Sequence, residues 1–539
     1  MKNLFKSLAK ISGLTLLSRI SGLARDVIIA RSFGAGPMTD AFWVAFRIPN
    51  LLRRLFAEGA FSQAFIPILK EIQKTESADR TQQLIDHTAL VLSISLLILT
   101  AIGIIGAPWF TLAVASGLTE NDNFEIATTM TRIMFPYILC MSLVSFASGI
   151  LNTWSRFAIP AFTPILLNLS MIACSLLLVH VVNVPIYALS IGVMVGGVLQ
   201  LGVQWMALAK LGLLPRFSLR FSAAFNDHDV RRLLKNMLPA ILGLSVTQIS
   251  ILINTNIATY LEHGSVTWLS FSDRLMEFPS ALLGMALGTV LLPSLSEAYS
   301  QKDSKTYNAL MDWGIKLILL FGLPACIGMA LLRTGLVSVL FNYGAFNELD
   351  VEKTSSAVLA YSIGLIGILS IKILAPAFYA RQDIKTPIKI GVIILCLTQA
   401  LNLIFVPLLQ HTGLTLSIAL GSLFNASLLY VYLRKHRFYQ PSESIIKFLV
   451  KLLPALIVLT LFLYLVQSPS DWLNSLNNHG ITYWTQQLLM NVVTDPLKSF
   501  QISRIICLFG LIFASILCYF ATLFICGFRI RDFKRYSPS

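Results

Sequence analysis

Charged residues are scarce in this sequence. Only 12% of its 539 residues are Asp, Glu, Lys or Arg, whereas 56% are hydrophobic. A soluble domain of ordinary composition is about 25% charged. The shortage of charge therefore argues against a soluble globular protein and indicates one that passes through a membrane many times.

The sequence also lacks the motifs of common catalytic and metal sites. Its seven cysteines form no C-x-x-C pair and nearly all lie in apolar runs, which favours buried thiols over disulfides or zinc ligands. The seven histidines show no ligand spacing, and neither G-x-x-x-x-G-K-[ST] nor H-E-x-x-H occurs. The longest stretch between expected helices, 467–500, is too short for a nucleotide-binding domain. We expect no enzyme activity, no cofactor and no metal site.

Long apolar runs dominate the rest of the sequence. A membrane-spanning helix needs about 20 apolar residues, and fourteen such runs are present, most of them separated by Pro or Gly. The first is expected to be retained and not cleaved as a signal peptide, because Arg19 and Arg25 interrupt it. The expected fold is all-α, with helix cores at 8–32, 38–66, 84–107, 127–151, 159–182, 185–208, 235–260, 267–295, 313–332, 355–379, 386–408, 413–433, 445–467 and 501–527.

The distribution of positive charge supports this count. If the N-terminus is cytoplasmic, most of the 41 lysines and arginines fall in inner loops and tails, and the outer loops hold only Arg333, Lys353, Lys498 and Arg504. Cytoplasmic loops of membrane proteins are enriched in Lys and Arg. One helix more or fewer would disturb the alternation, so we expect both termini to be cytoplasmic. Topology and attraction to anionic lipids account for the net charge of +15 without a nucleic-acid partner.

A weak internal repeat divides the chain. Ile66-Pro67 corresponds to Leu292-Pro293, and Thr163-Pro164 to Thr386-Pro387, at a spacing of about 225 residues. Six expected helices separate the copies, and an even number leaves both halves in the same orientation. Two parallel lobes of this kind suit alternating access to a central site. The expected parts are an N-lobe, a C-lobe and a C-terminal helix pair, at 1–212, 213–438 and 439–539.

Charged residues interrupt the first two expected helices, where charge is costly. A charge at the bilayer centre costs roughly 2.5–3.5 kcal/mol, yet the stretch 19–58 within these two helices carries nine charged residues. Arg19 and Asp26 lie seven residues apart, as do Asp40, Arg47 and Arg54, so each set shares a helical face. We expect them to face water or one another. A hydrated cavity lined by arginines favours an anionic ligand, because guanidinium binds phosphate or carboxylate through two N–H groups.

A second cluster of charge lies in the eighth expected helix. Asp273 and Glu277 are one turn apart, and Arg274 precedes Glu277 by three residues, so an internal ion pair forms easily. Basic residues outnumber acidic ones at membrane depth, and internal pairing cannot neutralise them all. We therefore expect Arg274 to face Arg25 and Arg53 across the interface between the lobes. The alternative is a set of salt bridges that only locks the lobes together.

Several of these positions have structural explanations of equal or greater merit. Arg19 lies near the cytoplasmic end and can extend toward the interface. Asp40 can cap the N-terminus of the second helix, and Arg54 can pair with Glu58 one turn later. The sequon Asn168-Leu-Ser170 lies within an apolar run and has no meaning there as a glycosylation site.

Long stretches of the chain resemble the MurJ (MviN) family of lipid II flippases in the multidrug/oligosaccharidyl-lipid/polysaccharide (MOP) exporter superfamily. The segments that carry the resemblance include SRISGLARDVIIARSFGAG, TDAFWVAFRIPNLLRRLFAEGAFSQAFIPIL and FSDRLMEFPSALLGMALGTVLLPSLS. The resemblance implies a fourteen-helix fold with a central cationic cavity in the bacterial inner membrane. It implies transport of lipid II, the undecaprenyl-pyrophosphate-linked peptidoglycan precursor, to the outer leaflet, with a groove for its tail along the last two helices. The substrate-binding residues implied are Arg19, Arg25, Asp40, Arg53 and Arg274, with Asp273 and Glu277 beside them.

The resemblance leaves some features open. A sodium site of some family members uses acidic residues where this chain has Asn254 and Asn402, so we assign no sodium ion. Membrane lipids are expected contacts, and enzymes of cell-wall synthesis are candidate partners. The alternatives are an exporter of another polyprenyl-pyrophosphate-linked oligosaccharide, a MATE-like drug antiporter and a non-transporting scaffold. A drug antiporter should have a net acidic site for cationic drugs, and a scaffold has no use for arginines inside the membrane.

Overall fold

The secondary structure in the part of the chain that the structure describes is entirely helical, with turns and short loops between the helices. The structure is a computed structural model and describes residues 2–54, 61–120, 123–216, 221–473, 480–491 and 493–529, without the side chains of 2–12, 120, 238–240, 242–244 and 282–290. Among the described residues, ten helices are long and apolar enough to cross a membrane. The prediction of an all-α, multi-pass membrane protein is confirmed.

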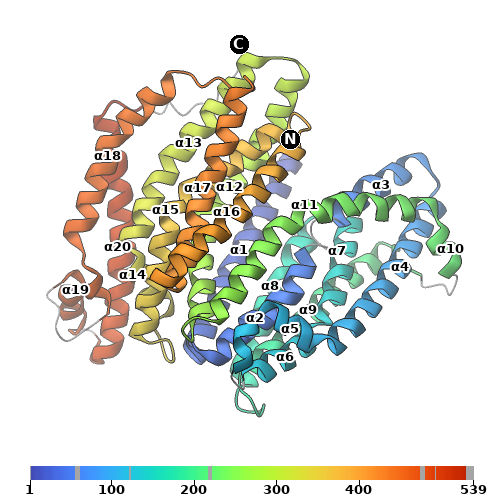
Figure 1. The fold of residues 1–539 in the computed structure, drawn as a ribbon, viewed down its shortest axis with the longest axis horizontal. Coiled ribbons are helices and arrows are strands. Elements are labelled where there is room, and N and C mark those ends of the chain that lie inside the picture. Colours follow the sequence, from blue (N-terminus) through green and yellow to red (C-terminus); the bar gives the residue numbers. More distant parts are fainter. Residues whose placement is uncertain are drawn as a thin grey trace. The chain divides into compact units, whose positions relative to one another are not determined.

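Each of the fourteen expected spans overlaps one or two helices of the structure (Figure 1), and residues 55–60 of the second span lie outside the described residues. These helices are α1 (Lys2–Phe33), α2 (Pro37–Leu52) with α3 (Ser62–Thr75), α4 (Ala78–Ile105), α6 (Asn123–Met134) with α7 (Tyr137–Thr153), α8 (Ala158–Leu177), α9 (Tyr187–Lys210), α11 (His228–Thr259), α12 (Ser265–Ser300), α13 (Ser304–Leu331), α15 (Glu348–Tyr379), α16 (Lys385–Leu409), α17 (His411–Lys435), α18 (Ser444–Val466) and α20 (Pro496–Ile525). Shorter elements connect some of them: α5 (Ala107–Val114), η2 (Ser116–Glu120), α10 (Phe221–Asn226), α14 (Arg333–Phe341), η3 (Pro469–Trp472) and α19 (Ile481–Leu489).

The fourth expected span is interrupted by a proline. The sequence predicts one helix over 127–151, but α6 ends at Met134 and α7 begins at Tyr137, with Pro136 as its N-cap residue. Proline has no N–H to donate and disfavours helical geometry in the residue before it. The apolar run is therefore continuous although the backbone helix is not.

The chain separates into two compact units, Met1–Thr267 and Trp268–Ser539. In the first unit α9 packs against both α7 and α8; in the second, α17 packs against both α15 and α16. The turns before α8 and α16 also match, because Ser155 and Gln382 have φ angles of 60° and 61°. The recurrence of packing and turn supports the internal repeat, whereas the lobe boundaries at 212 and 438 stay a prediction.

The last two long helices belong to the second unit. Leu452, Leu459 and Leu463 of α18 share an apolar core with Leu508 and Leu511 of α20. The same core includes residues of α13 and α14, so α18 and α20 are packed against the helices that precede them in this unit.

The sequence analysis places Arg504 in an outer loop. In the structure, Arg504 is instead part of this packed region. It lies on α20, which begins at Pro496, and only 2% of its surface is exposed. Its guanidinium donates to the carbonyl oxygen of Trp472 at 3.2 Å and lies 4.9 Å from the centre of the Phe500 ring. The carbonyl oxygen and the aromatic face stabilise the buried guanidinium of Arg504, which the loop prediction places in solvent.

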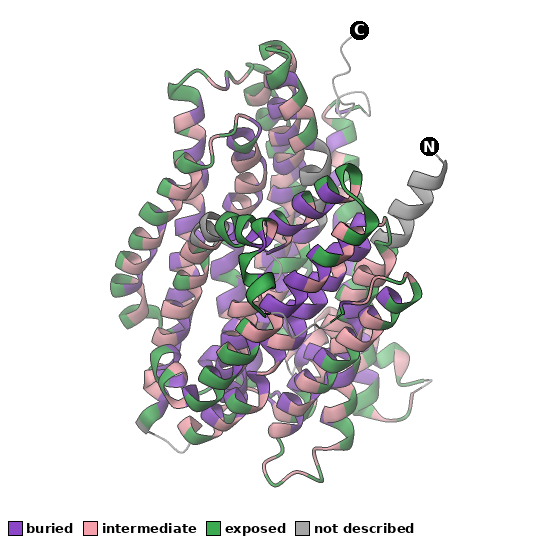
Figure 2. Cartoon of the chain, turned by 90° about the vertical axis from the view of Figure 1, so that its right-hand side faces the viewer, coloured by how far each residue is buried: buried purple, intermediate pink, exposed green. Residues whose placement is uncertain are grey.

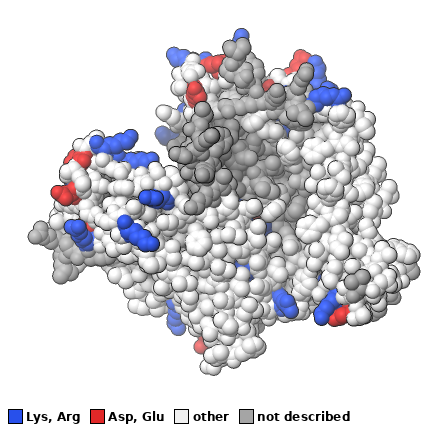
Figure 3. Space-filling view, turned by 180° about the vertical axis from the view of Figure 1, so that it is seen from behind, with Lys and Arg blue, Asp and Glu red and all other residues white. Residues whose placement is uncertain are grey.

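The outer surface of the helices is suited to lipid. Exposed, intermediate and buried positions alternate along individual helices (Figure 2), and many exposed positions are large and apolar, such as Leu403, Leu465 and Ile525. On the face drawn in Figure 3, uncharged atoms cover most of the described surface, and the Lys, Arg, Asp and Glu side chains form small separate groups. This distribution fits helices that cross a hydrocarbon layer.

An ion cluster joins α4 to the start of α11. Asp227 is buried and caps α11 by accepting from the Asp229 backbone N at 2.9 Å. The Arg80 guanidinium donates to both Asp227 oxygens at 2.7 and 3.0 Å and to Asp229 Oδ2 at 2.6 Å. His87 Nδ1 lies 2.8 Å from Asp227 Oδ2. Burial alone would raise the pKa of Asp227, but the hydrogen bonds from Arg80 and His87 outweigh it and hold that pKa well below its usual range.

We expect this cluster to make stability depend on pH. Because the pKa of Asp227 is lower in the folded than in the unfolded chain, its contribution is complete above its ordinary pKa of 3.8 and is lost as the pH falls below that value. Asp227→Asn should lower the free energy of unfolding by about 2 kcal/mol at neutral pH. The melting temperatures of the unaltered protein and of Asp227→Asn should converge as the pH is lowered from 6 to 3. A difference in melting temperature that stays constant over this range would contradict the assignment.

Candidate functional site

The charged residues of α1 include a buried ion pair. Arg25 donates from Nε and Nη2 to Asp26 Oδ1 at 2.9 and 2.6 Å, and both side chains are buried. The third nitrogen of the Arg25 guanidinium, Nη1, donates to Asn168 Oδ1 of α8 at 3.2 Å. The sequence analysis predicts that Arg25 faces a hydrated cavity. In the structure, Arg25 lies beside the Asp26 carboxylate within the first unit.

Asn168 is a polar residue that sequence reasoning missed. Besides accepting from Arg25, its amide donates from Nδ2 to the carbonyl oxygen of Ser18 at 3.1 Å and to Ser21 Oγ at 2.9 Å. One side chain of α8 thus contacts two successive turns of α1. A buried asparagine inside an apolar run is a signal of such a contact, because burying an unpaired amide is costly.

Asp40 caps a different helix from the one predicted. The N-cap residue of α2 is Gly36, which makes no side-chain cap hydrogen bond. The buried carboxylate of Asp40 instead accepts from the Gly264 backbone N at 2.6 Å, the Thr267 backbone N at 2.8 Å and Thr267 Oγ1 at 2.6 Å. These groups form the start of α12. Gly264 has a φ of 97°, a left-handed conformation that favours glycine in this turn.

Four other arginines, Arg19 on α1, Arg47 on α2 and Arg53 and Arg54 just after α2, differ in their surroundings. Arg19 is exposed, consistent with extension toward an interface. Arg47 donates to Thr255 Oγ1 of α11 at 2.5 Å, and Arg53 donates from Nε and Nη2 to Asn50 Oδ1 at 3.1 and 2.7 Å. Arg54 is exposed, and its expected partner Glu58 lies outside the described residues.

The second predicted cluster lies on α12 in the second unit. Arg274 Nη1 and Glu277 Oε2 are 3.0 Å apart, which confirms the predicted internal pair, and the two side chains are 37% and 50% exposed. Asp273 accepts a hydrogen bond from the Tyr361 hydroxyl of α15. Lys372 of α15 donates to the Ser280 carbonyl oxygen at 2.6 Å and to Ser280 Oγ at 3.0 Å. Asp273 and Lys372 thus tie α12 to α15, while the Arg274–Glu277 pair stays accessible.

The arrangement separates six of the seven predicted site residues into two groups, and the seventh, Arg53, has intermediate exposure. Arg25, Asp40 and Asp273 make buried or partly buried contacts that position helices. Arg19, Arg274 and Glu277 are wholly or partly exposed on membrane-length helices. The expected convergence of Arg25, Arg53 and Arg274 involves both units and stays a prediction. Among the described residues, no group of three His, Cys, Asp or Glu side chains could hold a metal ion.

Comparisons with known proteins agree with the resemblance seen in the sequence. The family model described as lipid II flippase MurJ matches residues 29–477. A lipid II flippase MurJ of Burkholderia cenocepacia is 46% identical over 534 residues, which cover 99% of each chain. A probable lipid II flippase MurJ of Vibrio cholerae is 37% identical over 543 residues, covering 99% of this chain and 98% of the other.

Two solved structures share the fold. A lipid II flippase MurJ in an inward closed conformation has a TM-score of 0.76 and 22% identity, covering 96% of this chain and 98% of the other. An inward-facing multidrug resistance MATE family transporter of the MOP superfamily has a TM-score of 0.65 and 15% identity, covering 79% and 97%. The structural likeness establishes the architecture, and the sequence match extends over nearly the full length. The chain therefore belongs to the MurJ family of lipid II flippases.

Proposed function

We propose that this protein moves lipid II from the cytoplasmic to the periplasmic leaflet of the bacterial inner membrane by alternating access. The observation that carries the proposal is the match to lipid II flippases over nearly the whole chain. The charges on α1, α2 and α12 add a physical reason, because a pyrophosphate can cross hydrocarbon only where cations replace its water. Both termini are placed in the cytoplasm, as the distribution of Lys and Arg suggests.

Arg274 is the best-placed residue to contact the pyrophosphate. Its side chain is 37% exposed, and its partner Glu277 is more exposed still. An accessible ion pair is worth little, typically 0 to about 1 kcal/mol. A pyrophosphate offers several anionic oxygens to the two N–H groups of the guanidinium and can displace one carboxylate. Arg19 and Arg53 are proposed as further contacts.

The buried polar residues have a different role in this proposal. Arg25 and Asp26 fix α1 against α8, Asp40 fixes α2 against the start of α12, and Asp273 fixes α12 against α15. These contacts would set the positions from which the accessible arginines reach the substrate. The polyprenyl tail would stay in lipid, along the exposed apolar residues of α18 and α20.

The charge of the substrate also determines the direction of transport. An inside-negative membrane potential favours outward movement of a net anion by about 2.3 kcal/mol per charge per 100 mV. Among the alternatives, the excess of Lys and Arg over the single Asp26 on α1 disfavours an antiporter for cationic drugs. Enzymes of cell-wall synthesis, which consume lipid II outside the membrane, are proposed partners.

Arg274→Ala tests the proposal. Removing a charge-assisted pair of hydrogen bonds should lower lipid II translocation by about 10- to 100-fold, measured in cells depleted of other flippases. Arg274→Lys should have an intermediate rate of translocation, because an ammonium keeps the positive charge but cannot form the bidentate hydrogen bonds of a guanidinium. The control is Arg434→Ala, an exposed arginine in the last turn of α17. Unchanged translocation by a normally abundant Arg274→Ala protein would refute the role of Arg274.

A further inference from the structure

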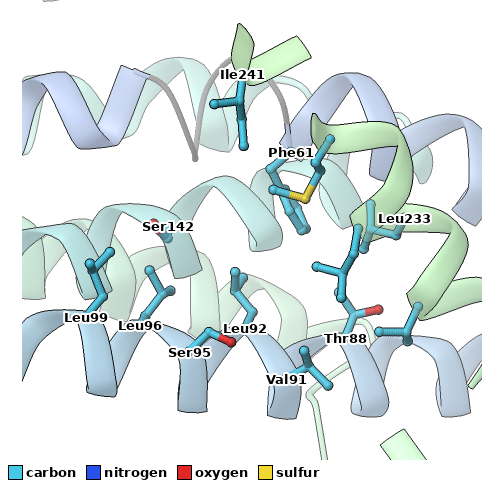
Figure 4. Close-up of a pocket in the computed structure, with 13 residues that line it drawn as sticks. Phe61, Thr88, Val91, Leu92, Ser95, Leu96, Leu99, Ser142, Leu233 and Ile241 are labelled. Atoms are coloured by element: carbon cyan, nitrogen blue, oxygen red, sulfur yellow. The ribbon is translucent and has the colours of Figure 1, made fainter. Parts of the chain in front are cut away.

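The first unit encloses a cavity of about 240 Å³ between α4, α7 and α11 (Figure 4). Leu92 and Leu96 of α4, Ser142 of α7 and Leu233 of α11 are among the residues that line it, and none of its described lining residues is charged. Such a lining selects no particular ligand. The exposed apolar surface of the second unit is more specific, because it changes from apolar to charged along one helix.

One exposed stripe of α20 indicates where this helix leaves the hydrocarbon layer. Its large apolar residues recur every three or four positions and include Ile502, Ile506, Phe509, Phe513, Phe520 and Phe524. The next position of the stripe, Lys498, is charged, exposed and 3.7 Å from Asp495. From Ile502 to Phe524 the helix rises by about 33 Å, close to the hydrocarbon thickness of about 30 Å. One boundary of the hydrocarbon therefore lies between Ile502 and Lys498.

The short helix α19 lies beside this boundary. It packs against α20 and is seen at the lower left of Figure 1. Thr485 Oγ1 of α19 is 3.1 Å from Cys507 Sγ, on the hydrocarbon side of the boundary. Gln486 donates from Nε2 to the carbonyl oxygen of Pro496 at 3.1 Å, on the aqueous side. The helix thus crosses the level at which α20 changes from apolar to charged.

The exposed surface of α19 has an apolar stripe, while two of its polar side chains are turned inward. Thr482 and Gln486 are buried and donate to backbone carbonyl oxygens. Trp484 and Leu488 are 62% and 73% exposed, and four residues apart they share one stripe. Gln487 is also exposed, about 60° further round the helix. A surface helix in water has its apolar residues toward the core, whereas a helix at the edge of lipid turns polar groups inward.

Trp484 lies at the depth of the boundary. It stands between Ile481, whose carbonyl oxygen is 3.6 Å from Cys507 Sγ, and Gln486, which reaches Pro496. Tryptophan is enriched at this depth in membrane proteins, because its amphipathic ring suits the zone between hydrocarbon and water. A membrane surface therefore fits α19 better than a protein partner, which would have to displace the lipid in contact with α20.

We propose that α19 is an interfacial helix, with Trp484 and Leu488 inserted among the acyl chains next to α20 and Gln487 facing the head groups and water. The leaflet is the periplasmic one in the topology proposed above, and ordinary phospholipids are sufficient partners. The contact holds the connection between α18 and α20 at the membrane surface. Recognition of lipid II is not involved.

Tryptophan fluorescence tests the proposal with the full-length protein in phosphatidylcholine vesicles. The protein has eight tryptophans, so the emission of Trp484 is obtained as the difference between the unaltered protein and Trp484→Phe. Lipid brominated near the carbonyl end of one acyl chain quenches fluorophores that reach the acyl chains. It should at least halve the Trp484 emission, whereas aqueous iodide should change it little. Because Trp484 is exposed, Trp484→Phe should stay folded.

Two neighbouring positions provide a matched pair in the Trp484→Phe protein. Leu488→Trp places a tryptophan on the apolar stripe, where the brominated lipid should quench it. Gln487→Trp places one on the polar stripe, where iodide should quench it more strongly than the lipid does.

Quenching of Trp484 by iodide and not by the brominated lipid would overturn the proposal, because α19 would then face water. Protection of Trp484 from both quenchers would overturn it as well, because a protein surface would then cover α19. The vesicles contain no lipid II, so a failure here leaves the result of the translocation assay unaffected.

Discussion

Asp40→Ala is expected to lower the free energy of unfolding by about 3–4 kcal/mol. The Asp40 carboxylate accepts three hydrogen bonds at the start of α12, two of them from the backbone N–H groups of Gly264 and Thr267. Both residues are buried, so water cannot replace the lost acceptor. The negative charge also interacts favourably with the positive end of the α12 dipole. Thermal unfolding in detergent micelles should show a drop of several degrees.

Two matched variants separate the parts of this effect. Thr267→Val removes one of the three hydrogen bonds and should cost about 1 kcal/mol. Asp40→Asn keeps the shape but removes the charge and points N–H groups toward backbone donors, so it should lose most of the stabilisation. An Asp40→Ala protein that melts like the unaltered one would show that the cap contributes nothing.

The same variant tests whether Asp40 contacts the substrate. If Asp40 acts only through the position of α12, folded Asp40→Ala protein assayed at low temperature should retain lipid II binding. Loss of binding in a folded sample would instead assign Asp40 a direct contact. Arg274→Ala should behave oppositely, with transport lost and melting nearly unchanged, because its ion pair is exposed.

The helices of this protein follow from local properties of the sequence. Apolar runs of membrane length predict every long helix, because in hydrocarbon the backbone must satisfy its own hydrogen bonds. Prolines explain the departures: Pro136 interrupts a run that is apolar throughout. Short connecting helices such as α10 and α14 escape prediction because neither their length nor their composition separates them from loops.

The partners of the charged residues could not be predicted in the same way. Asp40 and Gly264 are 224 residues apart, and Arg25 and Asn168 are 143 apart. Helical spacing predicts which side chains share a face of one helix, as it does for Arg274 and Glu277, but not which face of another helix they meet. Polar residues in apolar runs mark such contacts without naming the partner. Asn168 and Arg504 are both examples.

Arg25 shows a further limit of spacing arguments. Adjacent residues on a helix point about 100° apart and do not face each other, so helical spacing places Asp26 on the same face as Arg19, seven residues away, and not on that of Arg25. In the structure the long Arg25 side chain turns back so that its Nε and Nη2 both reach Asp26. Side-chain length, which helical periodicity ignores, decides the pairing.

Arg25→Ala is expected to destabilise the protein by about 3–5 kcal/mol, because it leaves the Asp26 carboxylate buried without its guanidinium. Arg31→Ala is the matched control, since Arg31 is exposed on the same helix and its loss should change stability by no more than about 0.5 kcal/mol. Both are measured by thermal unfolding in detergent, alongside Asp26→Asn.

A double variant tests whether Arg25 and Asp26 are energetically coupled. Breaking a buried ion pair is costly mainly because one charge is stranded, whereas replacing both charges can be nearly neutral. Arg25→Leu combined with Asp26→Asn should therefore be more stable than Arg25→Leu alone or Asp26→Asn alone, with a coupling energy of about 2–3 kcal/mol in the double-mutant cycle of these four proteins. Additive losses would mean that Arg25 and Asp26 contribute independently, and that Arg25 stabilises α1 chiefly through Asn168. The pair would then be free to separate, and Arg25 could turn toward a substrate anion as the sequence predicts.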